Sequence, residues 1–249
     1  MNLLKEQVRR GRIAWMHIKA RRKKEIDLPL GTTVIVAPHP DDEVLGCGGL
    51  MQRLITQGHE VHVVFMTGGE ASHRNCCELP EEQIKKERRK LACQINPTLG
   101  VDIDHLHFLD FPDGGIKKES REAMHLKELM ELLNPSTIFV PHWGEGWPDH
   151  IQTTSILKEI VNNDVNIYEY CVWMWYYNVW HLDWEKAQIL RMKEPEHQQK
   201  MSAVDNYTMP KASCGRPWSG VLPRVLIESA KWKFELYFLS SKENRTIPQ

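Results

Sequence analysis

Residues 32–37, with the sequence Thr-Thr-Val-Ile-Val-Ala, form an uninterrupted run of small and β-branched side chains. A strand without polar alternation is buried on both faces, which is typical of the centre of a parallel sheet. Further strand-like runs lie at 61–66, 105–109 and 137–140, and segments with helical character lie between them or after them at 44–58, 81–95, 119–133 and 150–162. Strands that alternate with helices predict an α/β fold, with a mostly parallel sheet and helices on both faces.

The rest of the chain shows a different pattern. Strand-like segments at 167–177 and 188–192 follow each other closely and favour antiparallel strands, a helix is expected at 195–207, and residues 233–239 alternate as a strand does. A length of 249 residues suits one large α/β domain with an added arm. We therefore predict a basic amphipathic helix over residues 1–27 and a single domain over residues 28–249.

The arm is rich in positive charge. Its apolar residues fall near helical spacing at Leu4, Val8, Ile13, Trp15, Met16 and Ile18. Nine basic residues accompany them, at Lys5, Arg9, Arg10, Arg12, Lys19, Arg21, Arg22, Lys23 and Lys24. Two interpretations stay open: an interfacial helix on anionic lipid, or a helix packed on its own body with Leu4, Val8 and Trp15 buried.

Charge and cysteine content exclude some classes of protein. The 32 basic and 33 acidic residues give a net charge of -1, so the chain as a whole has no electrostatic footprint for nucleic acid. The cysteines are Cys47, Cys76, Cys77, Cys93, Cys171 and Cys214. They form no C-x-x-C pair, which argues against a thiolate zinc knuckle. With no apolar run near the ~20 residues of a membrane span, we expect a cytoplasmic protein with free thiols, peripheral on the inner membrane face if the arm binds lipid.

An imidazole and three carboxylates follow the first strand directly, in residues 38–43 (Pro-His-Pro-Asp-Asp-Glu). In a parallel sheet, ligands bind beyond the carboxyl ends of the strands. Adjacent carboxylates repel each other unless a positive charge lies beside them, and a metal ion supplies it. We predict that His39 and Asp42 bind one cation and that Asp41 acts on a water. The three glycines that follow, Gly46, Gly48 and Gly49, predict close packing of the next helix on the sheet.

A second group of polar residues follows the strand at 137–140, in the loop 141–150. In a strand order of 3-2-1-4-5, the first and fourth strands are neighbours, so their loops face each other and His150 reaches the ion. Two histidines and one carboxylate leave a coordination position open for water, which is typical of catalytic zinc (Zn²⁺). Asp113, in a turn after the third strand, is interpreted equally as a turn residue or a substrate contact.

Tryptophans are concentrated in the second half of the chain. They lie at Trp143, Trp147, Trp173, Trp175, Trp180 and Trp184. They suggest an aromatic wall beside a substrate, although packing in the core is the more common use of such residues.

These motifs, in this order, resemble those of the PIG-L or LmbE-like zinc-dependent de-N-acetylases. The resemblance covers about residues 32–165 and rests on residues 38–49, 67–70, 111–114 and 148–150. It implies a Rossmann-like fold and zinc-dependent removal of the acetyl group from an N-acetylated amino sugar similar to N-acetylglucosamine, which could be lipid- or nucleotide-linked. It also implies that His39, Asp42 and His150 are the zinc ligands and that Asp41 is the general base.

Other roles follow from the resemblance less directly. Asp113 would contact the substrate or orient the site, and Arg74 or Lys86 would match a substrate-binding arginine of the family. Many members carry a histidine three residues before the last zinc ligand. This chain has Trp147 at that position, and we expect its side chain to contact the substrate. Glu145 or His142 could replace that histidine as proton donor, or Asp41 could serve as both base and acid. Alternatives to the deacetylase are an amidase that cleaves another N-acyl conjugate and a weakened sugar-binding homologue.

Overall fold

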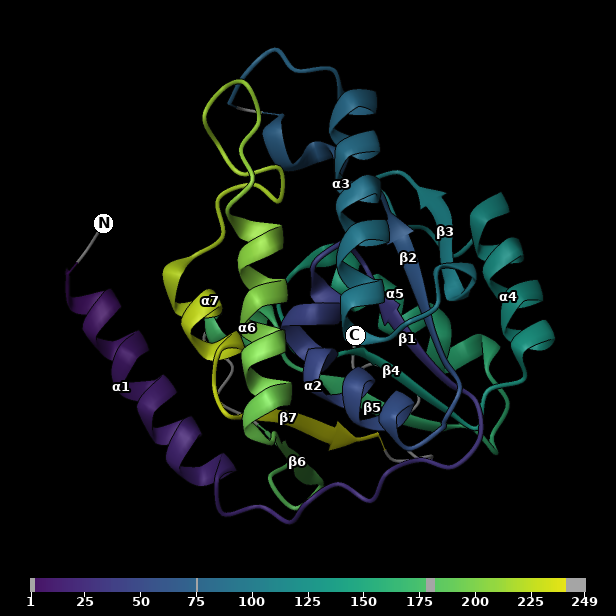
Figure 1. The fold of residues 1–249 in the computed structure, drawn as a ribbon, viewed down its shortest axis with the longest axis vertical. Coiled ribbons are helices and arrows are strands. Elements are labelled where there is room, and N and C mark those ends of the chain that lie inside the picture. The colour runs from purple at the N-terminus through teal and green to yellow at the C-terminus, as the bar shows by residue number, and fades with distance from the viewer. Residues whose placement is uncertain (1–2, 75, 178–181, 241–249) are drawn as a thin grey trace.

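The computed structural model describes residues 3–74, 76–177 and 182–240, and a seven-stranded sheet crosses its centre (Figure 1). The strand order is β3-β2-β1-β4-β5-β7-β6. The strands are β1 (Thr33–Ala37), β2 (Val61–Thr67), β3 (Leu106–Phe111), β4 (Thr137–Pro141), β5 (Asn166–Tyr170), β6 (Ala187–Arg191) and β7 (Phe234–Leu239). Strands β1 to β5 pair in parallel, and β7 pairs antiparallel with β5 and β6. The predicted order 3-2-1-4-5 is confirmed.

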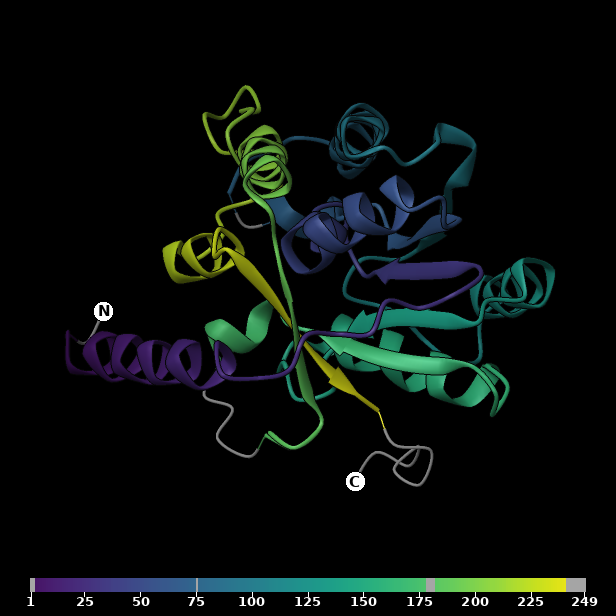
Figure 2. The same cartoon turned by 60° about the horizontal axis from the view of Figure 1, so that its bottom comes forward.

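Helices cover both faces of the sheet (Figure 2). The helices are α1 (Leu3–Ala20), α2 (Asp42–Thr56), α3 (Glu81–Ile95), α4 (Arg121–Leu133), α5 (Pro148–Ile160), α6 (Glu194–Thr208) and α7 (Arg224–Ala230). Ile35 of β1 belongs to the core under α2, α3 and α6, whereas Val34 and Val36 belong to the core under α4 and α5. This two-sided burial explains why the first strand lacks polar alternation.

Helix α2 approaches the sheet closely because of its glycines. A Cβ atom added to Gly46 would lie 2.3 Å from Cδ2 of Tyr170, and one added to Gly49 would lie 2.4 Å from Sδ of Met192. Tyr170 is itself fully buried and donates a hydrogen bond to the carbonyl of Val36. The close packing predicted from the glycines is confirmed, and it fixes the helix whose first residue, Asp42, belongs to the site.

The expectation for residues 167–177 is partly wrong. Strand β5 ends at Tyr170, and Trp173–Trp175 forms a 3-10 turn. Strands β5 and β6 are not neighbours, because β7 lies between them and pairs with both. Hydrophobic periodicity indicates which side chains a strand buries, but it does not identify the neighbouring strand.

Helix α1 packs on the body through one face. Ile13, Met16 and Ala20 are buried in a cluster with residues of β6 and β7. Arg12 is buried beside them and donates hydrogen bonds to two backbone carbonyls of the 3-10 turn after β5. Trp15 is 47% exposed, so packing on the body is confirmed through a different set of residues than expected.

The opposite face of α1 leaves Val8 and Ile18 exposed as well. The side chain of Leu4, the first two residues of the arm, Trp180 and the last nine residues of the predicted 28–249 domain lie outside what is described. Of the helices described, none is both long enough and apolar enough to cross a bilayer. The domain boundary at residue 27 stays a prediction.

Candidate active site

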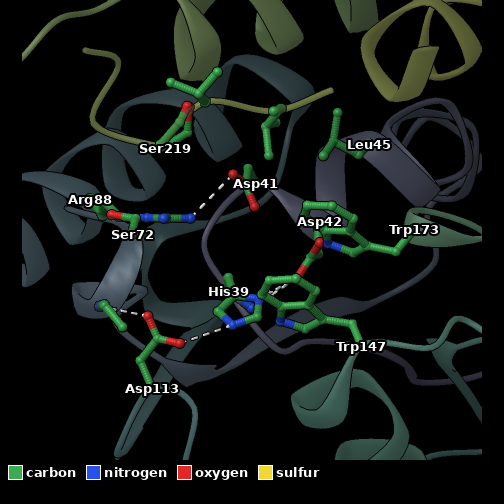
Figure 3. Close-up of a pocket in the computed structure, with 14 residues that line it drawn as sticks. His39, Asp41, Asp42, Leu45, Ser72, Arg88, Asp113, Trp147, Trp173 and Ser219 are labelled. Atoms are coloured by element: carbon green, nitrogen blue, oxygen red, sulfur yellow. Dashed lines mark hydrogen bonds and ion pairs between the residues drawn. The ribbon is translucent and has the colours of Figure 1, made fainter. Parts of the chain in front are cut away.

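A cavity of about 230 Å³ opens beyond the carboxyl end of β1 (Figure 3). It lies where the strand order reverses between β1 and β4, which is the usual ligand position in such sheets. Its polar wall is made of His39, Asp41, Asp42, Ser72, Arg88, Asp113 and Ser219, and its apolar wall of Leu45, Trp147, Trp173, Val221 and Leu222. Pockets that bind drug-sized ligands have volumes of about 300 Å³ or more. The smaller volume of this cavity suits one sugar-sized group.

The turn between β1 and α2 is built around a strained residue. Asp41 has a φ of 142°, a conformation that normally requires glycine. Its backbone amide donates a 3.0 Å hydrogen bond to Oε2 of Glu43, and the other carboxylate oxygen of Glu43 accepts hydrogen bonds from Asn96 and Tyr207. Buried Glu43 therefore holds the turn in place, and the turn presents the Asp41 side chain to the cavity.

His39, Asp42 and His150 converge beside the cavity, which His39 and Asp42 line and next to which His150 is fully buried. Oδ2 of Asp42 lies 3.1 Å from Nδ1 of His39 and 3.2 Å from Nε2 of His150. The latter nitrogen is buried and lies within ion-pair distance of Asp42, but it makes no well-aligned hydrogen bond to any of the described residues. Zinc bonds of ~2.0–2.1 Å hold adjacent nitrogen and oxygen ligands ~3.3 Å apart in a tetrahedral site. The three side chains thus fit one ion, for which Nε2 of His150 would be one of the ligand atoms.

The electrostatics of this group also favour a cation. Burial alone would lower the pKa of His150, but Asp42 and Glu145 raise it to about 9. Burial likewise opposes the charged form of His39, yet its pKa is raised well above the ordinary value by three surrounding carboxylates. Without a metal, the carboxylates are balanced by protonated imidazoles, and a divalent ion would supply the same positive charge.

Carboxylates behind the two histidines orient the rings. Nε2 of His39 lies 3.3 Å from both Asp113 and Asp149, and Nδ1 of His150 lies 2.6 Å from Oε2 of Glu145. Asp113 and Asp149 are fixed in turn by backbone amides, those of Ala71 and Gly114. Such partners set which ring nitrogen faces a metal, as in many zinc sites.

Asp41 faces the cavity beside Arg88. Nη2 of Arg88 donates to Oδ2 of Asp41 at 3.1 Å and to the carbonyl of Pro40 at 2.9 Å. Burial raises the pKa of Asp41 to about 7, against the opposing effect of Arg88. A cavity-facing carboxyl group with such a pKa is chemically suited to exchange protons near neutral pH.

Glu145 and His142, the two candidates for a proton donor, lie outside the cavity lining. Glu145 is fully buried and accepts hydrogen bonds from His150 and from the backbone amides of Val172 and Met174. Nδ1 of His142 accepts from the amide of Gly144, and burial lowers the pKa of His142. The structure brings Glu145 to the back of His150 and places His142 beside Glu169 and the ring of Phe238.

The substrate candidates are distributed unevenly. Asp113 and Trp147 line the cavity, and Trp147 stacks on Trp173 with ring centroids 4.6 Å apart. Arg74 is exposed and pairs with Glu81 at 2.8 Å, outside the lining, and Lys86 is exposed on α3.

The other tryptophans divide between core and surface. Trp175 and Trp184 are buried in the cluster beside α1, and Trp143 is 40% exposed. Packing in the core is confirmed for Trp175 and Trp184, whereas an aromatic wall beside a substrate stays a prediction for Trp147 and Trp173.

Arg88 and Asp149 were not assigned roles in the sequence. Arg88 lies on the buried face of α3 with Ile84, Ala92 and Ile95. A charged residue on the apolar stripe of an amphipathic helix needs a partner, and this signal could have identified it. Asp149 belongs to the motif at 148–150, but its contacts with His39 and Gly114 join separate loops and have no local signature.

Comparison with known proteins places these motifs in a wider group. The family model described as "PIG-L: GlcNAc-PI de-N-acetylase" matches residues 34–161, just over half of the chain. A 1D-myo-inositol 2-acetamido-2-deoxy-alpha-D-glucopyranoside deacetylase of Corynebacterium diphtheriae is 27% identical over 156 residues, covering 52% of this chain and 52% of that protein. A 4-oxalmesaconate hydratase of Pseudomonas putida is 23% identical over 126 residues, covering 49% and 48%.

A solved structure shares the fold. The N,N'-diacetylchitobiose deacetylase from Pyrococcus horikoshii has a TM-score of 0.58 and 23% sequence identity, covering 70% of this chain and 68% of that chain. The chain spans about half the length of the two curated relatives. The matched region contains the sheet edge with His39, Asp42 and His150.

Proposed function

Because the chain belongs to the GlcNAc-PI de-N-acetylase (PIG-L) family, we propose that it is a metal-dependent hydrolase that removes an acetyl group from the nitrogen of an amino sugar. The observation that carries the proposal is the convergence of His39, Asp42 and His150 beside a cavity that His39, Asp42 and Asp41 line. The relatives named for deacetylation of an acetamido sugar and of diacetylchitobiose support this substrate class.

The cofactor we propose is zinc. Nδ1 of His39, a carboxylate oxygen of Asp42 and Nε2 of His150 would hold it, since these atoms face one another. Zinc held by these residues would supply Lewis-acid activation of a water molecule and of the amide carbonyl. Glu145, Asp113 and Asp149 keep the two imidazoles turned so that these nitrogens face inward.

Asp41 is the residue to which we assign proton transfer. As a carboxylate it accepts the proton of the attacking water, and it then returns that proton to the amine nitrogen as the amide bond breaks. Arg88 holds the carboxylate at the cavity wall through a 3.1 Å hydrogen bond. Because Trp147 carries no exchangeable proton suited to this task, Asp41 serves as both base and acid.

The aromatic pair gives the substrate its second contact surface. Trp147 and Trp173 stack and border the cavity opposite Asp41 and Arg88, as Figure 3 shows. Indole rings bind the apolar faces of sugar rings and acyl groups well. We infer that the acetamido group lies toward Asp41 and Asp42, and that the sugar ring lies against the indoles.

Release of acetate tests the proposal directly. Protein reconstituted with zinc should release acetate from at least one member of a panel of free, nucleotide-linked and lipid-linked N-acetylated amino sugars. Variants His39→Ala and His150→Ala should each lose the zinc ion of this site together with acetate release. Metal-loaded protein that releases no acetate from the whole panel would contradict the proposal.

The hydratase relative motivates a second candidate. A relative in sequence is named 4-oxalmesaconate hydratase, so addition of water to an unsaturated acid is an alternative use of the same site. Loss of the substrate's conjugated ultraviolet absorption without release of acetate would favour it over the deacetylase.

Peripheral contact with an anionic membrane is the last part of the proposal. Val8, Trp15 and Ile18 form an exposed apolar stripe on α1, a helix that carries many basic residues. Such a helix binds at a lipid interface through both its apolar face and its charges. We accordingly propose a cytoplasmic enzyme that reaches lipid-linked substrates at the inner face of the membrane.

A further inference from the structure

Three thiols and an imidazole meet at the rim of the cavity, away from His39. His73 ends the 3-10 turn Glu70–His73, Cys76 and Cys77 follow it, and Cys214 comes from the loop between α6 and α7. Sγ of Cys76 lies 3.4 Å from Sγ of Cys77 and 3.9 Å from Sγ of Cys214. A ring nitrogen of His73 and the sulfurs of Cys76 and Cys214 all lie within 4.8 Å of one another.

The sulfur spacing matches ligands that share one ion. Zinc–sulfur bonds of ~2.3 Å in a tetrahedral site hold two thiolates ~3.8 Å apart. The observed separation of Cys76 and Cys214 is 3.9 Å, whereas a disulfide requires a bond of ~2.0 Å. All six cysteines of the chain are free.

His73 supplies an independent indication of a ligand. Its side chain is buried at 1% exposure, and its Nδ1 contacts the hydroxyl of Ser72 at 3.0 Å. Its Nε2 is buried and has no hydrogen-bond partner in the part of the chain that the structure describes. Buried polar atoms are nearly always paired, so the unpaired nitrogen of an imidazole that lies beside two thiols indicates a bound species that satisfies it.

We propose that His73, Cys76 and Cys214 bind a second divalent cation of the zinc class, with the thiol of Cys77 next to that of Cys76. Zinc favours such mixed sulfur and nitrogen ligands, particularly in structural sites. The lack of a C-x-x-C pair argued against this chemistry in the sequence. The fold overcomes that lack by joining residues 138 positions apart.

The second ion would fasten two loops that form one wall of the cavity. Ala71 and Ser72 come from the loop of His73, and Ser219 and Gly220 come from the loop of Cys214. Within the described residues these loops touch through a 3.4 Å hydrogen bond from Ser72 to the carbonyl of Trp218. The ion would hold the wall at a fixed distance from Asp41, which is a structural role and does not depend on the proposed hydrolysis.

Cobalt substitution tests the site of His73, Cys76 and Cys214, because it gives a signal that the site of His39, Asp42 and His150 cannot give. Cobalt bound by thiolate shows a charge-transfer absorption in the near ultraviolet, whereas ligation by His39, Asp42 and His150 involves nitrogen and oxygen alone. We expect this absorption in the reduced full-length protein and in His39→Ala, with about two ions bound per wild-type chain and about one in His39→Ala.

Cysteine variants complete the test. Cys76→Ser and Cys214→Ser should each lose the thiolate absorption and one bound ion, and His73→Ala should weaken both. Cys93→Ser is the matched control, because Cys93 is a half-buried thiol on α3 outside the cluster, and it should behave as wild type.

Two outcomes would overturn the second site. One is the absence of thiolate absorption in the wild type. If mild oxidation of that protein then links Cys76 to Cys214, the two thiols are a redox pair and not a metal site. The other is absorption that persists in both Cys76→Ser and Cys214→Ser. Hydrogen exchange of residues 212–222 provides a second measurement. Zinc should slow this exchange in the wild type but not in Cys214→Ser. Equal exchange with and without zinc in the wild type would argue against an ion that joins the two loops.

Discussion

Asp41 combines a strained backbone with an unusual side-chain environment. A φ of 142° costs free energy of order 1–3 kcal/mol for a residue other than glycine and persists only where neighbouring contacts impose it. Here the contacts are Glu43, which accepts the Asp41 amide, and Arg88, which holds the carboxylate. Strain of this kind is consistent with a residue selected for chemistry rather than for the stability of the turn.

Replacement of Asp41 by Asn should separate catalysis from metal binding. The amide keeps the size of the side chain but cannot accept a proton, so we expect turnover to fall by ~10²-fold or more. Zinc content should stay at the wild-type level, because Asp41 is not among the side chains that converge on the ion. Acetate release at the wild-type rate would show that another group transfers the proton.

Glu145 tests the difference between a proton donor and a positioning residue. Its carboxylate accepts a 2.6 Å hydrogen bond from His150, so Glu145→Gln should weaken zinc binding by ~10–100-fold, as loss of such outer partners typically does. His142→Gln, which alters a buried histidine of the same loop, should leave zinc affinity unchanged. A Glu145→Gln variant with normal zinc affinity but reduced turnover would support the proton-donor role instead.

Individual elements were predictable to different degrees. The parallel strands were recognisable because burial on both faces produces apolar runs, and α3 was predicted with the bounds Glu81–Ile95 that it has. The position of β7 between β5 and β6 was not predictable, since pairing across so many residues leaves no local pattern.

The same distinction applies to the site. His39, Asp42 and His150 could be brought together from the sequence because they follow neighbouring strands in a known order. The roles of Glu145 as a partner of His150 and of Cys214 as a partner of Cys76 depend on how loops pack in three dimensions. Arg88 lies between these cases, because its position on an apolar helix face was visible but its partner was not.

Close packing of α2 on the sheet makes a prediction at the scale of the element. Gly46→Ala would place a methyl group 2.3 Å from the buried ring of Tyr170, so we expect the free energy of unfolding to fall by about 1–3 kcal/mol. Gly11→Ala is the control, because Gly11 lies in α1 with open space around it and should gain about 1 kcal/mol in helix propensity. Chemical denaturation measures both, and equal stability of Gly46→Ala and wild type would disprove the tight contact.

At the scale of the whole molecule, α1 packs one face into the hydrophobic cluster beside β6 and β7 and exposes apolar side chains on its other face. Ile13, Met16 and Ala20 pack against the end of the sheet formed by β6 and β7. The chain after α1 adds to that edge, since the amide of Ile26 donates to the carbonyl of Ile189 and the amide of Ile189 donates to Lys24. The arm is therefore attached to the body in two places: through the buried face of α1, and through the backbone hydrogen bonds of Lys24 and Ile26 with Ile189.

The other face of α1 exposes Val8 and Ile18, and Trp15 on the same face is half-exposed while its ring also packs edge-on against Trp184 of the body. At 100° per residue, Val8, Trp15 and Ile18 fall within about 80° of the helix circumference, on the side opposite Ile13 and Met16. Removal of the whole arm would disturb both faces together, because it would expose the apolar cluster beneath α1. Point variants are needed to separate packing from contact with lipid.

Val8→Ser combined with Ile18→Ser should abolish co-sedimentation with anionic vesicles at low salt while leaving the free energy of unfolding within about 0.5 kcal/mol of wild type, because both side chains are exposed. Met16→Ala is the matched variant of the buried face; it should lower stability by about 2–5 kcal/mol and keep vesicle binding, since it leaves the exposed stripe intact. Wild-type binding should decrease at physiological salt, as charge attraction is screened. A wild-type protein that stays in the supernatant at both salt concentrations, or a double variant that sediments as well as wild type, would show that this stripe does not bind membranes.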